Sequence, residues 1–373
     1  MTNKTPAYFL FSTGYMPVLI FLVCMLYSNI SVTAQILTVP ANGGSTKAMI
    51  SERIGLTDVS IHYGRPAVKG RQGKIWGGIV PEGFGKDAGR PQPWRAGANE
   101  NTTIAFSTDV IIENTPVPKG KYGFFVAYYP DRCILIFSGN SNSWGSYFYD
   151  EKEDVARITV KPLTTESLQE RLSYTFDHQT DSSATVLLSW EYKVIPFRVT
   201  ADLQKTQLAS FKNELRTDKG FDPAAWLQYA DYLTDQGLLP DEALLYASNA
   251  AQASPSFRSL SLLSDILYKA GKNKEADSVM RKAIYFGNPY QVHYYALGQL
   301  KKNEKNELSR AEMIFKLNRD KEPELYITNL GLANYYKAAG NNKKARQQAH
   351  KALKFAATPN QKDEINTLLK AIE

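Results

Sequence analysis

Two short polar segments hold the residues best suited to bind a ligand. Guanidinium and ammonium groups pair with carboxylates or phosphates, and an amide beside a carboxylate can fix the hydroxyl groups of a sugar or metabolite. The first segment is basic and the second is mixed, and together they supply the candidate ligand-binding residues Arg65, Lys69, Arg71, Trp94, Arg95, Asn99 and Glu100. Convergence of the two segments would create a pocket for a small polar or anionic ligand.

A purely structural role for the same residues is the competing interpretation. In it, Arg95 and Glu100 pair with each other, while Asn99 and the neighbouring glycines form a tight turn. Aromatic side chains could also form a platform for a glycan, although aromatics beside strands belong to a core more often. The residues for such a platform are Trp94, Trp144 and Tyr149.

The chain lacks the common catalytic and metal-binding motifs. It has no His-Glu-x-x-His, Cys-x-x-Cys, Gly-Lys-Ser/Thr or Gly-x-Ser-x-Gly sequence, and its four histidines are scattered. Glu100 with Asp150 or Glu151 could form the carboxylate pair of a glycoside hydrolase. We expect no catalytic residues, no cofactor and no metal. The alternative is an envelope hydrolase that acts on a carbohydrate or other polar substrate in a pocket of the N-terminal half.

Four stretches of the N-terminal half form recognisable signatures. They read Tyr-Gly-Arg-Pro at 63–66 with Lys-Gly-Arg at 69–71, Trp-Arg-Ala-Gly-Ala-Asn-Glu at 94–100, Pro-Lys-Gly-Lys-Tyr at 118–122 and Trp-Gly at 144–145. In these stretches the chain resembles a bacterial family known only as domain of unknown function 2911. The resemblance covers roughly residues 36–200 and implies one domain that follows a signal peptide. That family has no established activity, so the resemblance implies a domain boundary and no mechanism.

The N-terminus has the three-part pattern of a secretory signal peptide. Lys4 precedes an apolar stretch over residues 16–27, and small residues allow cleavage after Ala34. A membrane-spanning helix needs about 20 apolar residues, which favours cleavage over an uncleaved anchor, and lipidation of Cys24 is a third interpretation. We expect residues 1–34 to be removed and the mature protein to be exported, periplasmic or extracellular, without a membrane span.

Removal of residues 1–34 would leave Cys133 as the only cysteine. One cysteine cannot form an internal disulfide, so stability must come from core packing. The apolar run over residues 133–137 predicts that this thiol is buried and acts as a small hydrophobic group.

Between residues 100 and 200, apolar and polar side chains alternate, as they do in strands with one buried face. Turn residues at 118–120, 130–131 and 138–142 separate the runs. The residues expected on the buried face are Ile104, Phe106, Tyr122, Phe124, Val126, Tyr128, Ile158, Val160, Leu172, Tyr174, Phe176, Val186, Leu188 and Trp190. The pattern predicts an antiparallel β-sandwich or barrel of short strands over residues 35–200, with residues 81–93 as an exposed loop.

After residue 200 the pattern becomes helical and repeats itself. Asp202 is a good N-cap for a linker helix within residues 201–220. Alanines then recur after polar turns at intervals of 33, 35 and 34 residues, at Ala243, Ala276, Ala311 and Ala345. This spacing resembles the tetratricopeptide repeat, a pair of antiparallel helices. We expect an all-α repeat array over residues 221–359 and a capping helix over residues 360–373. The third repeat departs from the pattern, because Asn318 replaces its second alanine.

The two halves together indicate a two-domain α+β binding protein. Stacked helix pairs form a concave groove that can hold a protein or peptide partner. The chain carries a net charge of +7, and the excess lies in the C-terminal half. The lysines of the last repeat either attract an acidic peptide or keep that repeat soluble, and an exported protein is not expected to bind nucleic acid. The sequence therefore predicts an exported, non-enzymatic binding or scaffold protein whose β-rich domain holds a small polar ligand.

Overall fold

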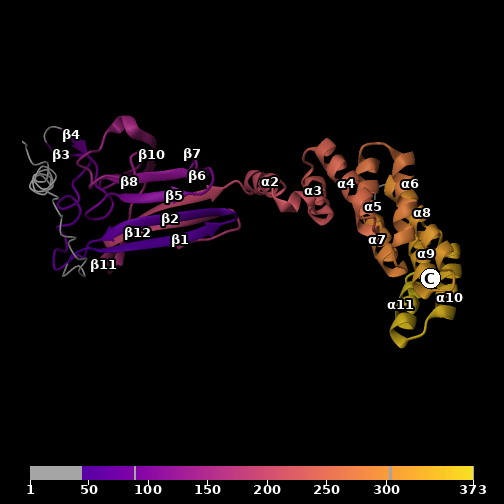
Figure 1. Cartoon of the computed structure of the whole chain (residues 1–373). Helices are drawn as coiled ribbons and strands as arrows, with labels where there is room; N and C mark the ends of the chain where they lie inside the picture. Colours follow the sequence, from indigo (N-terminus) through magenta and orange to yellow (C-terminus); the bar gives the residue numbers. More distant parts are fainter. Residues whose placement is uncertain (1–43, 88–89, 302–304, 373) are drawn as a thin grey trace, which may run out of the picture. The chain divides into compact units, whose positions relative to one another are not determined.

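The chain divides into two compact units at Ala201–Asp202 in the computed structural model (Figure 1). The structure describes residues 44–87, 90–301 and 305–372. The predicted signal peptide therefore lies outside the described residues. No described helix is long and apolar enough to cross a membrane. We call the parts before and after this boundary the β unit and the helical unit.

The β unit consists of antiparallel strands in two larger sheets and one small hairpin. The first sheet has the order β1-β2-β5-β8-β9-β10 and the second has the order β11-β12-β6-β7. The strands are β1 (Thr46–Ile54), β2 (Thr57–Arg65), β3 (Gly85–Asp87), β4 (Arg90–Gln92), β5 (Thr102–Phe106), β6 (Val110–Ile112), β7 (Thr115–Val117), β8 (Gly120–Tyr128), β9 (Cys133–Ser138), β10 (Asp154–Val160), β11 (Leu163–Asp177) and β12 (Ser183–Ala201). A short 3-10 helix, η1 (Glu151–Glu153), precedes β10.

One hydrophobic core joins the two sheets of the β unit. The residues predicted for the buried face all lie in this core or, for Phe176, pack against it. Phe124 of the first sheet and Phe197 of the second have ring centroids 5.6 Å apart. The antiparallel β domain predicted from the period of two is therefore confirmed, because each strand places alternate side chains against the opposite sheet.

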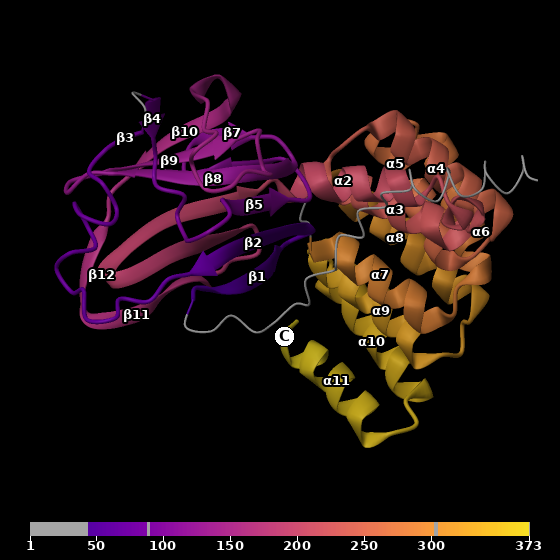
Figure 2. The ribbon, with the colours of Figure 1, turned by 60° about the vertical axis from the view of Figure 1, so that its left-hand side comes forward.

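Two expectations for the β unit were wrong. The strands are not uniformly short, since β11 has 15 residues and β12 has 19, and the pair forms a long ribbon (Figure 2). Residues 81–93 are not simply a loop, because they contain the β3–β4 hairpin, in which Gly85 pairs with Gln92. Such a hairpin is difficult to predict from a glycine-rich sequence, because few of its residues have side chains that can show an alternating apolar and polar pattern.

Cys133 is a buried free thiol at the start of β9, as predicted. Burial raises the pKa of this thiol to about 12. The thiol is therefore protonated at neutral pH and packs as a small hydrophobic side chain.

The helical unit begins directly after β12. The Asp202 side chain accepts a hydrogen bond from the Lys205 backbone N–H and caps the first helix, as predicted. The elements are α2 (Leu203–Glu214), the 3-10 helix η2 (Asp218–Phe221), α3 (Pro223–Gln236), α4 (Pro240–Ala253), α5 (Phe257–Lys269), α6 (Asn273–Phe286), α7 (Pro289–Lys301), α8 (Lys305–Lys321), α9 (Tyr326–Ala338), α10 (Asn342–Phe355) and α11 (Pro359–Lys370).

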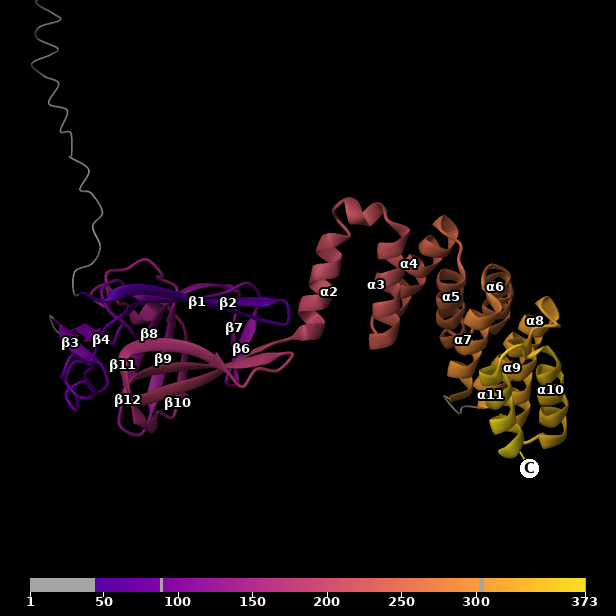
Figure 3. The ribbon, with the colours of Figure 1, turned by 90° about the horizontal axis from the view of Figure 1, so that it is seen from below.

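From α3 to α10 the helices pack as consecutive pairs, which follow one another in chain order in Figure 3. The recurring alanines are buried where the helices of a pair meet, because only a small side chain allows so close an approach. These buried residues are Ala243, Ala276, Ala311 and Ala345, followed by Ala250, Ala283 and Ala352. The predicted array of helical repeats is confirmed.

The irregular third repeat has a structural reason. Asn318 on α8 is fully buried, and its amide donates a hydrogen bond of 2.8 Å to the backbone carbonyl of Pro289. The amide thereby ties α8 to the first turn of α7. The side chain that breaks the alanine pattern thus supplies a hydrogen bond that an alanine could not make.

A charged network is buried between the second and third repeats. The Arg310 guanidinium lies 2.6 Å from a carboxylate oxygen of Asp265, and it donates a hydrogen bond to the Ser264 hydroxyl. The Tyr295 hydroxyl donates to the same carboxylate at 2.5 Å. The network connects α5, α7 and α8, so it holds two neighbouring repeats in one arrangement.

The last helix covers the end of the array. Thr358 and Gln361 form a reciprocal capping box at the start of α11. Ile365 and Leu368 of α11 are buried in a cluster with residues of α9 and α10. A terminal helix of this kind shields the apolar face that the last repeat would otherwise expose.

Candidate functional site

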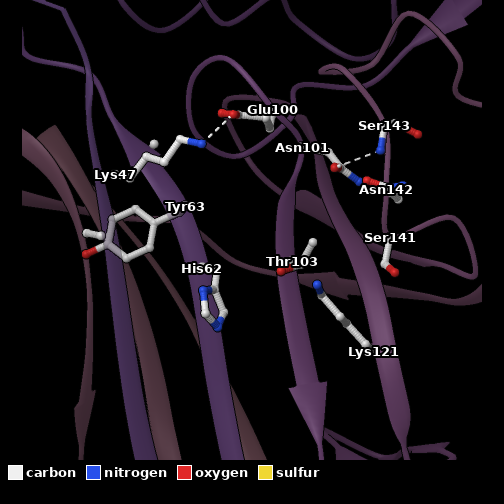
Figure 4. Close-up of a pocket in the computed structure, with 12 residues that line it drawn as sticks. Lys47, His62, Tyr63, Glu100, Asn101, Thr103, Lys121, Ser141, Asn142 and Ser143 are labelled. Carbon is white, nitrogen blue, oxygen red and sulfur yellow. Dashed lines mark hydrogen bonds and ion pairs between the residues drawn. The ribbon is translucent and has the colours of Figure 1, made fainter. Parts of the chain in front are cut away.

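The β unit has a polar hollow of about 260 Å³ that draws residues from five separate segments (Figure 4). Its lining includes two ammonium groups, an imidazole, a carboxylate and several hydroxyl and amide groups. The lining residues are Lys47, Ala48, His62, Tyr63, Gly64, Glu100, Asn101, Thr103, Lys121, Ser141, Asn142 and Ser143.

The floor of the hollow is the outer face of the first sheet. His62 on β2 is the register partner of Thr103 on β5, and Lys121 lies opposite Ala105 on the next strand, β8. The neighbouring residues Ile104 and Tyr122 point into the core instead. Because side chains alternate along a strand, the pattern that buries the core residues also places His62, Thr103 and Lys121 on one outer face.

Two glycines allow the walls of the hollow to approach the sheet. A side chain at Gly64 would overlap the carbonyl oxygen of Ala98, and a side chain at Gly123 would overlap the carbonyl oxygen of Asn140. Both obstacles are backbone atoms, which cannot move aside as a flexible side chain can. The segment before Glu100 and the loop around Asn140 therefore lie directly against β2 and β8.

Asn101 holds the far wall in place. This nearly buried side chain donates a 3.2 Å hydrogen bond to the carbonyl of Asn140 and accepts one of 3.2 Å from the Ser143 N–H. The loop is thus fixed on both sides of Ser141 and Asn142, so the polar groups of these two residues are presented by a rigid segment.

Glu100 is the candidate residue that faces the hollow. Its carboxylate lies 2.6 Å from the ammonium group of Lys47, which reaches it from β1. The hydrogen bond from Lys47 is the main cause that lowers the pKa of the Glu100 carboxyl, and a backbone hydrogen bond acts in the same direction. Glu100 is therefore ionised at neutral pH, and it pairs with Lys47 rather than with Arg95.

The three predicted arginines bind backbone carbonyls instead of facing this hollow. Arg65 donates to Leu172 at 3.0 Å and so ties the end of β2 to β11. Arg71 donates to Ala67 and Val68 within one turn, and Arg95 donates to Asn99 at 2.8 Å. These contacts give each guanidinium a structural role at the edge of a turn or strand.

The remaining candidates are spread over other places. Lys69 and Arg71 line a second hollow, of about 380 Å³, together with Gly44, Ser45, Pro66 and Ala67. Asn99 has a φ of 67°, which is the left-handed conformation expected of an asparagine in a tight turn. The two polar segments thus do not meet in one hollow through the residues that we singled out.

The aromatic residues also separate. Trp94 is buried, and its ring stacks on Trp190 with centroids 6.0 Å apart. Tyr149 is partly buried, and its hydroxyl donates to Asp154. Trp144, by contrast, is 56% exposed in the loop that follows Ser143. Of these three, only Trp144 offers an open ring, and it directly follows Ser143, which lines the polar hollow.

Of the carboxylates considered for hydrolysis, Glu100 lines this hollow but Asp150 and Glu151 do not. Asp150 caps η1, and Glu151 pairs with Arg157 at 3.5 Å. A general acid of a glycosidase needs a raised pKa, whereas the pKa of Glu100 is lowered. Among the residues that the structure describes, no group of three His, Cys, Asp or Glu side chains could hold a metal ion.

Most polar residues of the hollow were missed in the sequence. Lys121 and Thr103 stand at outward positions of predicted strands, where a polar side chain is ordinarily a solvated one. His62 was not assigned to a strand. Ser141 and Asn142 were assigned only to a turn. A useful signal was available, because the lining includes residues of three of the four stretches that resemble the family, namely Tyr63 and Gly64, Glu100, and Lys121. It also includes Ser143, which directly precedes the fourth stretch.

The helical unit has an aromatic cluster at the connection between α6 and α7. Its four side chains are between 39% and 77% exposed, whereas most other aromatic rings of the helical unit are buried or half-buried. Lys321 fixes this connection, since its ammonium group donates to the carbonyls of Tyr285 and Gly287 at the end of α6. The members of this aromatic cluster are Tyr285, Phe286, Tyr290 and Tyr294.

Solved structures that resemble this chain include tetratricopeptide-type proteins. MamA is 15% identical, with a TM-score of 0.28, and the match covers 41% of this chain and 88% of MamA. TTC0263 of Thermus thermophilus, described as a thermophilic TPR protein, is 21% identical with a TM-score of 0.27, over 45% of this chain and 91% of its own. YrrB, described as a TPR protein with an unusual peptide-binding site, is 15% identical with a TM-score of 0.27, over 44% and 83%.

No curated protein matches the chain. A family model does match, and it covers residues 45–199 of the β unit. The residues that line the hollow all lie within that range, as do Gly64, Gly123 and the loop that Asn101 holds. Residues 45–199 of this chain thus match the model of the family "Protein of unknown function (DUF2911)".

Proposed function

We propose that the protein is an exported binding protein whose helical unit holds a peptide segment of a partner. The observation that carries this proposal is the exposed aromatic cluster on an array whose other aromatic side chains are mostly buried or half-buried. Exposed apolar patches on a soluble fold are typical of interaction sites, and Tyr and Phe supply much contact area for little lost side-chain entropy. Helical repeats present such side chains on a rigid surface.

Substitution of Tyr290 and Tyr294 by alanine tests the peptide site. Peptides are selected from a random library with the full mature chain, and their affinities are then measured by isothermal titration calorimetry. We expect the double variant to bind at least about tenfold more weakly, which corresponds to about 1.4 kcal/mol.

Phe221→Ala is the matched control for this experiment. It also removes an exposed aromatic ring of the helical unit, at η2, outside the cluster. Its affinity should equal that of the unchanged protein. A library that yields no peptide sensitive to the Tyr290 and Tyr294 substitutions would contradict the proposal. A change in molar mass by sedimentation would instead assign the cluster to contact between two copies of this chain.

Export through residues 1–34 is the second part of the proposal. It is supported by the apolar stretch over residues 16–27 and the small residues before Gln35. N-terminal sequencing of the protein from fractionated host cells should give Gln35 as the first residue, in the periplasm or the medium. A cytosolic chain that still begins at Met1 would show that the segment is not a signal peptide.

The β unit is proposed to hold a small polar ligand in the hollow around Glu100. In this site the candidate Glu100 lies together with Lys121 and the loop that Asn101 holds, and the three arginines take no part. Support comes from the convergence of five segments on one rigid polar hollow. Pockets with a few fixed polar groups are the usual sites of small ligands.

A further inference from the structure

We propose that the hollow of the β unit binds a saccharide unit that carries a carboxylate. This inference rests on the small-ligand site proposed above and names its chemical class. Three features lead to it: one uncompensated positive charge, a row of fixed hydroxyl and amide groups, and an exposed tryptophan that directly follows the lining residue Ser143.

The charge of the hollow selects a single negative group. Lys47 is neutralised by Glu100, at 2.6 Å. The ammonium group of Lys121, in contrast, makes no hydrogen bond or ion pair with any other described residue, and Figure 4 shows this side chain on the sheet beside Thr103. One free ammonium group matches one carboxylate. A phosphate dianion would gain less here, because the ionised Glu100 repels its second charge and no guanidinium lines the hollow.

The loop around Ser141 and Asn142 is suited to hydroxyl groups. Ser141 and Asn142 lie between the two hydrogen bonds with which Asn101 holds the loop. Their side chains make no hydrogen bond to other described residues, so a hydroxyl and an amide remain available. Glu100 adds an acceptor to the lining of the hollow. Alternating donors and acceptors on a rigid wall bind a ligand with several hydroxyl groups better than a simple fatty acid or acetate.

The indole of Trp144 supplies the apolar contact that a sugar ring needs. It follows Ser143 directly and is 56% exposed, and Tyr147 and Phe148 of the same loop are exposed as well. A saccharide has an apolar face of C–H groups between its hydroxyls, and a flat amphipathic ring can cover that face. The hollow of about 260 Å³ is small enough to enclose a single unit.

The test is a pair of ligands that differ only in the carboxylate. Methyl β-glucuronide and methyl β-glucoside, with the corresponding galacturonide and galactoside, are titrated into the full mature protein by calorimetry, and acetate serves as a carboxylate without a ring. We expect at least one uronide to bind at least tenfold more tightly than its neutral counterpart and than acetate.

Two variants and one control locate the binding. Lys121→Gln should abolish the preference for the uronide over its neutral counterpart. Trp144→Ala should lower the affinities for the uronide and for its neutral counterpart by the same factor. Lys119→Gln removes the same charge two residues away, outside the hollow, and should change nothing. Circular dichroism confirms that each variant is folded.

The possible failures are distinguishable. Equal affinities for acidic and neutral sugars, unaffected by Lys121→Gln, would overturn the acidic class and leave the small-ligand site standing. A uronide that binds all variants equally would overturn its placement in this hollow. Absence of binding by every compound would overturn the saccharide proposal, and a broader screen of polar metabolites that also found no ligand would remove the small-ligand site itself.

Discussion

Replacing Arg310 by alanine should destabilise the helical unit by about 3 to 5 kcal/mol. Arg310 is 3% exposed and Asp265 is 23% exposed, so their 2.6 Å ion pair is largely shielded from water. Removal of the guanidinium leaves the Asp265 carboxylate without its cation. The Ser264 hydroxyl loses a hydrogen-bond partner, and the ring of Tyr268 loses the guanidinium that lies 4.7 Å above it.

Chemical denaturation followed by far-ultraviolet circular dichroism measures this loss, because all described α-helices lie in the helical unit. Arg258→Ala is the control, since Arg258 and Asp231 also link two helices, α5 and α3, but are 71% and 37% exposed. The control should cost less than about 1 kcal/mol. Equal losses for the two variants would mean that burial adds nothing to the Arg310 network.

The helical unit should also lose stability as the pH falls from about 6.5 to about 4. Burial lowers the pKa of the His293 imidazole to about 4, and a backbone contact with Ile327 opposes this shift less strongly. His293 is 0% exposed and lies between α8 and α9, near Phe315 and Gly331. The unfolded chain binds a proton near its ordinary pKa of about 6.5.

Between these two pKa values the unfolded state therefore holds a proton that the folded state lacks, so acid favours unfolding. The loss should approach about 3 kcal/mol below pH 4 and vanish above pH 7. His293→Leu introduces an apolar side chain of similar size that binds no proton, so it should remove this part of the pH dependence. His350→Gln, on the exposed surface of α10, should retain it. A pH profile that is identical in all three proteins would contradict the assignment to His293.

Side-chain periodicity was sufficient to predict the two folds. Burial of one strand face fixes alternation, which is why Tyr122, Phe124 and Val126 could be assigned to the core from the sequence alone. Close packing of helices requires small residues that recur once in each repeat, and Ala243 and Ala276 therefore indicated the helix pairs in the sequence. The β3–β4 hairpin was missed because its glycine and proline residues carry no such periodic signal.

The site was less predictable, because it depends on which strands become neighbours. Periodicity shows that Thr103 and Lys121 point outward, but only the order β2-β5-β8 places them with His62 on one floor. The arginines misled for a related reason. Arg65 finds the carbonyl of Leu172, which is 107 residues away in the chain, and no local pattern announces such a partner. A charged residue in a polar segment can therefore line a ligand site or donate a hydrogen bond to a backbone carbonyl at a strand end. The sequence alone does not distinguish these two roles.

The buried thiol of Cys133 makes the β unit convenient for site-specific fluorescence. Its protonated, inaccessible sulfur should be inert towards maleimide dyes while the protein is folded. A cysteine introduced at Ser141 would then be the reactive one among the described residues, and a dye attached there would sit on the rim of the hollow. Ligand entry could be followed as a change in emission without first engineering a cysteine-free background.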